Sequence, residues 1–199
     1  MGWEHPVFAR LYDLYMLPQE LWGVRARRRR VVEGATGLTL ELGVGTGLNF
    51  PFYRGVRFVV GVDPDPHMLG RARRRAGDAC VPVRLVRAAG EALPFADGTF
   101  DTVVSTLVFA TVPDADAAAR EVHRVLKRDG TLRFFEHFRS EQPLLARLQD
   151  LVAPAWKKVL GGCEPNRDIV GIFRAAGLQI LETVKFRGTF LLHGVAKPR

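Results

Sequence analysis

Residues 38–47 read LTLELGVGTG, an apolar stretch that runs directly into a glycine-rich turn. The apolar residues predict a buried strand at 38–42, with a helix after the turn. Glycine at positions 43, 45 and 47 permits positive backbone dihedrals and lets the backbone approach a ligand with no Cβ in the way. In an open parallel sheet this turn lies at the carboxyl ends of the strands, where ligands bind. The stretch therefore predicts an α/β fold with a ligand site at its first turn, and a tight structural turn is the alternative.

Short apolar runs bounded by turn residues predict six further strands. They are expected at residues 57–63, 81–88, 100–110, 131–138, 178–187 and 189–198. Because only a short turn at Gly188 separates the last two, one of them should be antiparallel. The other strands alternate with helices, which is typical of a parallel sheet covered on both faces. The sequence therefore predicts a Rossmann-like, seven-stranded, mostly parallel sheet with one antiparallel strand and helices on both faces, in a single domain over residues 1–199.

Apolar spacing, caps and breakers place the helices between these strands. They are expected at residues 6–32 (two short helices separated by Pro18), from Pro66 with Asp65 as its cap, from about Pro113 to Gly130, through Pro143 and Pro154, and at 167–177.

Two acidic residues accompany the glycine turn. Glu41 stands two residues before the first glycine and is suited to reach the ammonium group of a bound amino acid. Asp63 ends the second strand, where a carboxylate accepts both hydroxyls of a ribose. The dinucleotide fingerprint G-x-G-x-x-G is not kept, because Leu48 stands at its third position and the glycine comes one residue early, at Gly47. This pattern favours a nucleoside ligand without phosphates, such as S-adenosylmethionine, over a dinucleotide.

Four ordered motifs carry a family resemblance: LELGVGTGLN at 40–49, VVGVDPDPHML at 59–69, GEALPFADGTFDTVVSTLV at 90–108 and EVHRVLKRDGTL at 121–132. Together they resemble the class I S-adenosylmethionine-dependent methyltransferases, in particular the ubiquinone/menaquinone-type branch. The segments LNFPFY at 48–53, EH at 136–137 and PAWKKVLGGCEPNRD at 154–168 resemble bacterial relatives of the alkyl thiol methyltransferases. The resemblance implies transfer of a methyl group from S-adenosylmethionine to a small, lipophilic acceptor, a thiol first, with S-adenosylhomocysteine as product.

The resemblance also assigns a cofactor site by position. It implies the methionine end at Glu41, Gly43, Gly45, Gly47 and Asn49, the ribose and adenine at Asp63, Pro64, Met68, Gly90 and Glu91, and the sulfonium above Thr106 and Leu107. Many relatives carry an aspartate where Ala89 stands, so the backbone of Gly90, or Glu91, has to take the adenine amino group.

His137 is the best candidate for a catalytic base, at the carboxyl end of the fifth strand, because imidazole has a suitable pKa range. Its alternative role is to cap the strand or to bond a backbone carbonyl.

Tyr12 is a further candidate on the acceptor side, in an expected helical lid at residues 1–34, and packing onto the sheet is its alternative. The expected helical segment 138–176 also faces the acceptor, where Trp156 and Cys163 are expected to wall the pocket, although Cys163 is equally interpreted as a small structural hydrophobe. No metal site is expected.

A formal net charge of +8 is concentrated in the arginine runs at 25–30 and 71–75. Neither run alternates with stacking aromatic residues, so we expect solvated helix faces and no nucleic-acid partner. The basic N-terminal helices nevertheless suit peripheral contact with an anionic membrane.

The two cysteines are far apart, and no leader sequence is evident, which favours a cytoplasmic protein without disulfides or a zinc knuckle. A phospholipid or quinone methyltransferase at a membrane surface, and a non-catalytic cofactor-binding protein, remain alternatives. The oligomeric state is not predicted.

Overall fold

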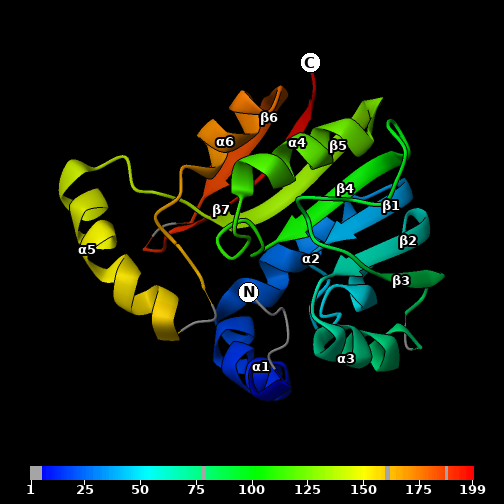
Figure 1. The fold of residues 1–199 in the computed structure, drawn as a ribbon, viewed down its shortest axis with the longest axis horizontal. Helices are drawn as coiled ribbons and strands as arrows, with labels where there is room; N and C mark the ends of the chain where they lie inside the picture. The colour runs from blue at the N-terminus through cyan, green and yellow to red at the C-terminus, as the bar shows by residue number, and fades with distance from the viewer. Residues whose placement is uncertain (1–5, 78, 160–161, 187) are drawn as a thin grey trace.

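A seven-stranded sheet forms the centre of the computed structural model, which describes residues 6–77, 79–159, 162–186 and 188–199 (Figure 1). The spatial order of the strands is β3-β2-β1-β4-β5-β7-β6. Strands β1 to β5 run parallel to one another, whereas β7 is antiparallel to both β5 and β6. The bounds are β1 Gly37–Leu42, β2 Val56–Asp63, β3 Val83–Arg87, β4 Phe100–Thr106, β5 Leu126–His137, β6 Leu178–Lys185 and β7 Leu191–Pro198. The predicted mostly parallel sheet with one antiparallel strand is confirmed.

Helices cover both faces of this sheet, as predicted. Apolar residues of α4 and α6 pack on one face, and those of α2 and α3 pack on the other. The helices are α1 Pro6–Gln19, η1 Glu20–Val24, α2 Arg25–Glu33, η2 Phe50–Phe52, α3 Pro66–Ala76, α4 Ala115–Val125, α5 Pro143–Val159 and α6 Ile169–Ala175. Two neighbours on β5 show the alternation of a strand: the Phe134 ring packs 5.0 Å from Phe173 of α6, and the Phe135 ring packs 6.1 Å from Phe186 on the opposite face.

The central strands are apolar almost without interruption, because a parallel sheet buries both of its faces. Four consecutive residues of β1 and five of β2 are buried up to their carboxyl ends. The polar residues that end these strands therefore enter the protein interior next to the turns that follow. Asp65 caps α3 as predicted, accepting a 2.7 Å hydrogen bond from the backbone N–H of His67.

Several predicted boundaries are wrong. Pro18 lies within α1, and the break comes later, at Gly23, whose φ of 104° is one that glycine adopts without a steric cost. The helix expected after the glycine turn is the single 3₁₀ turn η2, because Pro51 and the start of β2 at Val56 leave no room for more.

Two further boundaries differ around β4 and β5. Gly130 does not end a helix: α4 stops at Val125, and Gly130 lies inside β5, where the pairing with β4 shifts register between Phe100 and Thr102. Strand β4 ends at Thr106, because Leu107 turns the chain with a φ of 60°. Three parts of the predictions lie outside the described residues. They are the expected end of the sixth strand at Arg187, residues 1–5 of the expected lid, and residues 160–161 of the segment 138–176. No helix in the described part of the chain is long and apolar enough to cross a membrane.

Candidate active site

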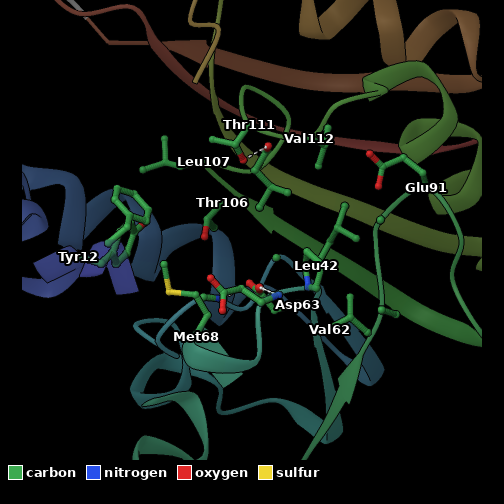
Figure 2. A pocket seen from close by; sticks show the side chains of 18 residues that line it. Tyr12, Leu42, Val62, Asp63, Met68, Glu91, Thr106, Leu107, Thr111 and Val112 are labelled. Carbon is green, nitrogen blue, oxygen red and sulfur yellow. Dashed lines mark hydrogen bonds between the residues drawn. The ribbon is translucent and has the colours of Figure 1, made fainter. Parts of the chain in front are cut away.

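A cleft of about 200 Å³ opens at the carboxyl ends of β1, β2 and β4. Figure 2 shows Tyr12 and Met68 at one end, Glu91 at the other, and Asp63 and Thr106 between them. Ten of the residues assigned from the sequence line it: Tyr12, Gly43, Gly45, Asp63, Pro64, Met68, Gly90, Glu91, Thr106 and Leu107. Glu41, Gly47, Asn49 and His137 do not, and the sequence did not indicate Phe8, which does.

The glycines of the turn have different surroundings. A Cβ on Gly43 would lie 2.6 Å from a Val108 methyl group, and one on Gly47 would lie 2.6 Å from the Phe50 ring, so both glycines are needed for close packing. A Cβ on Gly45 would meet nothing nearer than the Gly43 carbonyl oxygen at 4.0 Å. Since Gly45 lines the cleft with a φ of 53°, its missing side chain leaves space that a ligand can use.

Asp63 is fixed in place by backbone donors. Its Oδ2 accepts a 2.9 Å hydrogen bond from the Gly45 N–H, and its Oδ1 accepts one of 2.9 Å from the Asp65 N–H. Each carboxylate oxygen keeps a further lone pair for a ligand. Burial raises the pKa of Asp63 to about 6. A ribose diol, which donates two hydrogen bonds, fits this carboxylate.

The Glu91 end of the cleft suits an adenine ring. Leu42, Val62 and Val112 provide apolar walls there (Figure 2). Glu91 Oε1 accepts a 3.3 Å hydrogen bond from the Asp114 N–H, whereas Glu91 Oε2 is buried with no partner among the described residues. A buried acceptor without a donor is costly, and an exocyclic amino group would satisfy it. This carboxylate can therefore take the part of the aspartate that Ala89 replaces.

A buried polar network lies beneath the cleft. The Asn49 amide nitrogen donates to Glu41 Oε1 at 2.9 Å and to the Thr106 hydroxyl at 3.0 Å. Burial raises the pKa of Glu41 to about 7. Glu41 and Asn49 therefore lie one layer below the cleft surface and reach it through Thr106.

Arg28 completes this network, and the sequence analysis missed it. Its Nη1 donates to Asn49 Oδ1 at 3.0 Å and to the Thr106 hydroxyl at 2.9 Å, and its Nη2 pairs with Glu20 at 2.9 Å. The run 25–30 was interpreted as a solvated face, yet Arg28 is 3% exposed. The helical spacing from Val24 to Arg28 and Val31 was the available signal, because it places Arg28 on the buried face of α2.

Helix α1 is fastened over the cleft by Asp13, a second residue that the sequence analysis missed. Asp13 accepts hydrogen bonds from the hydroxyl of Thr46 in the glycine turn at 2.6 Å, and from Arg71 and Arg75 of α3 at 2.8 and 3.1 Å. Tyr12 is thereby held against the cleft, and burial raises the pKa of its hydroxyl group, which keeps it protonated.

His137 lies in a different cavity from the cofactor cleft, together with Trp156. Its Nδ1 is buried with no hydrogen-bond partner among the described residues, and burial lowers its pKa to about 4. Its neighbour Glu136 points to the other face of the sheet, where it accepts hydrogen bonds from Ser105 and from the backbone of the loop that follows β4. Cys163 is buried, which raises its thiol pKa to about 11. Within the described residues, no group of three or more His, Cys, Asp or Glu side chains is placed to hold a metal ion.

Comparison with known proteins identifies relatives of this chain. A family model described as a methyltransferase domain matches residues 40–134. The chain is 34% identical over 131 residues to a phosphatidylethanolamine N-methyltransferase of Cereibacter sphaeroides, an alignment that covers 65% of this chain and 64% of that protein. It is 36% identical over 146 residues to the thiol S-methyltransferase TMT1B of Homo sapiens, covering 69% of this chain and 60% of that protein. The chain thus spans less than two thirds of the length of either relative.

A solved structure agrees in fold. The S-adenosylmethionine-dependent methyltransferase of Thermotoga maritima superposes with a TM-score of 0.69 at 19% identity, over 96% of this chain and 98% of that one.

Proposed function

Because the chain belongs to the class I S-adenosylmethionine-dependent methyltransferases, we propose that it transfers the cofactor's methyl group to a small, lipophilic acceptor, with a thiol favoured. The observation that carries this proposal is the cleft that joins Gly45, Asp63 and Glu91. A nucleoside without phosphates suits this cleft in three ways. The space over Gly45 admits it, the lone pairs of the Asp63 carboxylate can accept its ribose hydroxyls, and the buried unpaired Glu91 oxygen can accept its amino group.

The residues of the cleft have distinct roles in this proposal. Asp63 accepts the ribose hydroxyls, and Glu91 Oε2 accepts the adenine amino group. Glu41 lies beneath the amino-acid end and acts on it through Asn49 and Thr106. The cofactor, when bound, supplies a methyl group on a positively charged sulfur that is open to in-line displacement. Tyr12 and Leu107 exclude water from the reacting end, and the segments 1–34 and 138–176 act as the lid and the acceptor-side segment.

The nucleophile in transfer to a thiol is the thiolate. A free cysteine thiol has a pKa of about 8.5, and a simple alkanethiol is a weaker acid, so only a small fraction of the acceptor is in the reactive form at neutral pH. Its sulfur forms the new bond to the methyl carbon as the bond from that carbon to the cofactor sulfur breaks, and the thiol proton passes to solvent. The similarity to a thiol S-methyltransferase supports this choice of acceptor.

The test measures S-adenosylhomocysteine formed from S-adenosylmethionine with 1-butanethiol, against a reaction without acceptor. Asp63→Asn should lose cofactor affinity at least tenfold, and Asp97→Asn, at a carboxylate that is 81% exposed, is the matched control. Turnover that needs both the thiol and Asp63 supports the proposal. Cofactor binding without turnover on any acceptor would leave the non-catalytic alternative.

A second candidate acceptor is a phospholipid or quinol taken from a membrane surface. Helix α1 and η1 expose Val7, Leu11, Leu14 and Leu21, and this spacing places them in one stripe that ends at Trp22, which is 87% exposed. A stripe of this kind suits an interfacial helix, with arginines nearby to attract anionic lipid, and one relative is a phosphatidylethanolamine N-methyltransferase. Co-sedimentation with phosphatidylglycerol vesicles that weakens with salt, and is lost in Leu14→Glu, supports this candidate. The absence of co-sedimentation argues against it.

A further inference from the structure

A second cavity, of about 360 Å³, lies between α5 and the carboxyl end of β5. Small-molecule sites typically have volumes of about 300–1,000 Å³ and mostly apolar walls. Leu148, Val152 and Trp156 of α5 form one wall, and His137, Phe190 and Leu191 lie opposite them. In Figure 1, α5 stands at one edge of the molecule, apart from the helices that cover the sheet.

Polar contacts attach α5 to its neighbours, and none of its described residues belongs to the two apolar clusters of the core. The Gln149 side chain accepts a 2.7 Å hydrogen bond from the Ser140 N–H and donates one of 3.1 Å to the Phe138 carbonyl oxygen. Asp150 pairs with Arg139 and accepts a 2.8 Å hydrogen bond from the Asn166 amide. These contacts hold the helix to the loops on either side of it.

The apolar side chains on the cavity wall are consequently left uncovered. Leu148, Val152 and Trp156 remain 54%, 42% and 40% exposed. Burying apolar area is worth about 25 cal/mol per Å², so an apolar occupant of the cavity would be stabilised by these side chains.

The cavity lies beside the cofactor cleft. Thr106, which lines the cleft, pairs with Phe135 of β5, and His137 stands two residues further along β5. Residues two apart on a strand point to the same face, and neighbouring strands lie about 4.8 Å apart. Thr106 and His137 are therefore separated by one strand spacing and by two residues along the strand, about 6.6 Å, on the same face of the sheet, so the cavity and the cleft are neighbours.

We propose that this cavity binds the hydrocarbon tail of the methyl acceptor, with its reactive end directed past His137 toward Thr106. The proposal rests on the methyltransferase function proposed above, and it names where acceptor specificity is set. His137 presents a neutral imidazole there, because burial lowers its pKa to about 4. It acts as a positioning group that hydrogen-bonds the acceptor's polar end.

The test measures binding of 1-octanol, an unreactive probe, by calorimetry without cofactor. Val152→Trp and Leu148→Trp, from successive turns of α5, fill the cavity. Leu151→Trp is the matched control, since Leu151 is 79% exposed and does not line the cavity. We expect the dissociation constant for octanol to rise at least tenfold in both filling variants and to stay within twofold in Leu151→Trp. Circular dichroism and S-adenosylhomocysteine binding confirm that each variant is folded.

Equal octanol binding by wild type and both folded filling variants, or no binding by wild type, overturns the proposal. A second readout separates it from the proposed function. KM for 1-alkanethiols should fall from four to eight carbons in wild type and lose this trend in the filling variants. If the protein methylates thiols without a chain-length trend, the cavity does not bind the acceptor's tail, although the proposed methyltransferase function stands. If octanol binding depends on Val152 but no thiol is methylated, the cavity binds an apolar ligand and the proposed function is wrong.

Discussion

Arg28 and Thr106 are joined by a 2.9 Å hydrogen bond from the guanidinium Nη1 to the threonine hydroxyl. Arg28 belongs to α2, whereas Thr106 is the last residue of β4 and lines the cofactor cleft. The N-terminal segment therefore contributes to the floor of a site whose other residues lie mostly at the carboxyl ends of the strands and in the turns that follow them.

Arg28→Met is expected to destabilise the protein and to weaken cofactor binding. It leaves the largely buried carboxylate of Glu20 unpaired, and breaking a buried ion pair costs about 3–5 kcal/mol. It also removes a donor from Asn49 and Thr106, so affinity for S-adenosylhomocysteine should fall at least tenfold. Urea unfolding and calorimetry measure the two effects. Arg29→Met is the control, because its exposed pair with Glu33 is worth about 0.3–0.5 kcal/mol; equal losses in both variants would contradict this role for Arg28.

Gly45→Ala should separate backbone strain from ligand contact when it is compared with Gly98→Ala. Both glycines have a positive φ, 53° and 60°, and neither added Cβ would meet an atom closer than 4.0 Å. Left-handed backbone costs alanine about 1–2 kcal/mol, so both variants should lose similar stability. Only Gly45→Ala places its methyl group in the cleft, and only it should lose S-adenosylhomocysteine affinity, at least tenfold by calorimetry. Similar affinities in the two variants would show that Gly45 does not face the ligand.

Asp63 should make the stability of the ligand-free protein depend on pH. Its pKa is about 6 when folded and about 3.9 in an unfolded chain. Between these values the folded state holds a proton that the unfolded state has lost, so stability falls as pH rises from about 4 to 6. Asp63→Asn removes this dependence, and its stability relative to wild type should grow by ~3 kcal/mol across that range. Urea unfolding at a series of pH values measures the difference.

Asp101→Asn provides a control of opposite sign. The ammonium group of Lys127 lowers the pKa of Asp101, so wild type should be the more stable protein above pH 4 and lose that advantage as the pH falls. If the stability difference between variant and wild type changes with pH in the same direction for Asp63→Asn and Asp101→Asn, the raised pKa assigned to Asp63 is wrong.

His137→Gln should raise KM for the thiol acceptor and leave the pH dependence of kcat unchanged. With its pKa lowered to about 4 by burial, the imidazole is already neutral above pH 6 and is a weak base toward a thiol. We expect a higher KM for the thiol and an unchanged pH profile of kcat between pH 6 and 9. A loss of kcat of about 100-fold or more, together with the loss of an ionisation near pH 6–7, would instead establish His137 as the base that the sequence indicated.

The sequence predicted those parts of the protein that short-range patterns determine. The apolar runs that lead to Gly43 and Asp63 indicated two buried strands and the ligand edge of the sheet, because strand ends and tight turns are encoded by neighbouring residues, whereas the spatial order of the strands came from the structure. Arg28 and Asp13 were missed because their partners, Thr106 and Thr46, lie 78 and 33 residues away in the chain. A run of arginines gives no indication of which one is buried until the helix is packed. The prediction that His137 is a base stays a prediction, and only the folded chain shows that it shares a cavity with Trp156.

The attachment of α1 through Asp13 has a kinetic consequence. Asp13, Arg71 and Arg75 are partly buried, so salt screens their ion pairs less than it would on an open surface. Ala9 and Met16 of the same helix are buried as well, so apolar packing adds to these contacts. In the proposed function, in which α1 covers the cofactor, we therefore expect an increase in ionic strength alone to speed product release only slightly.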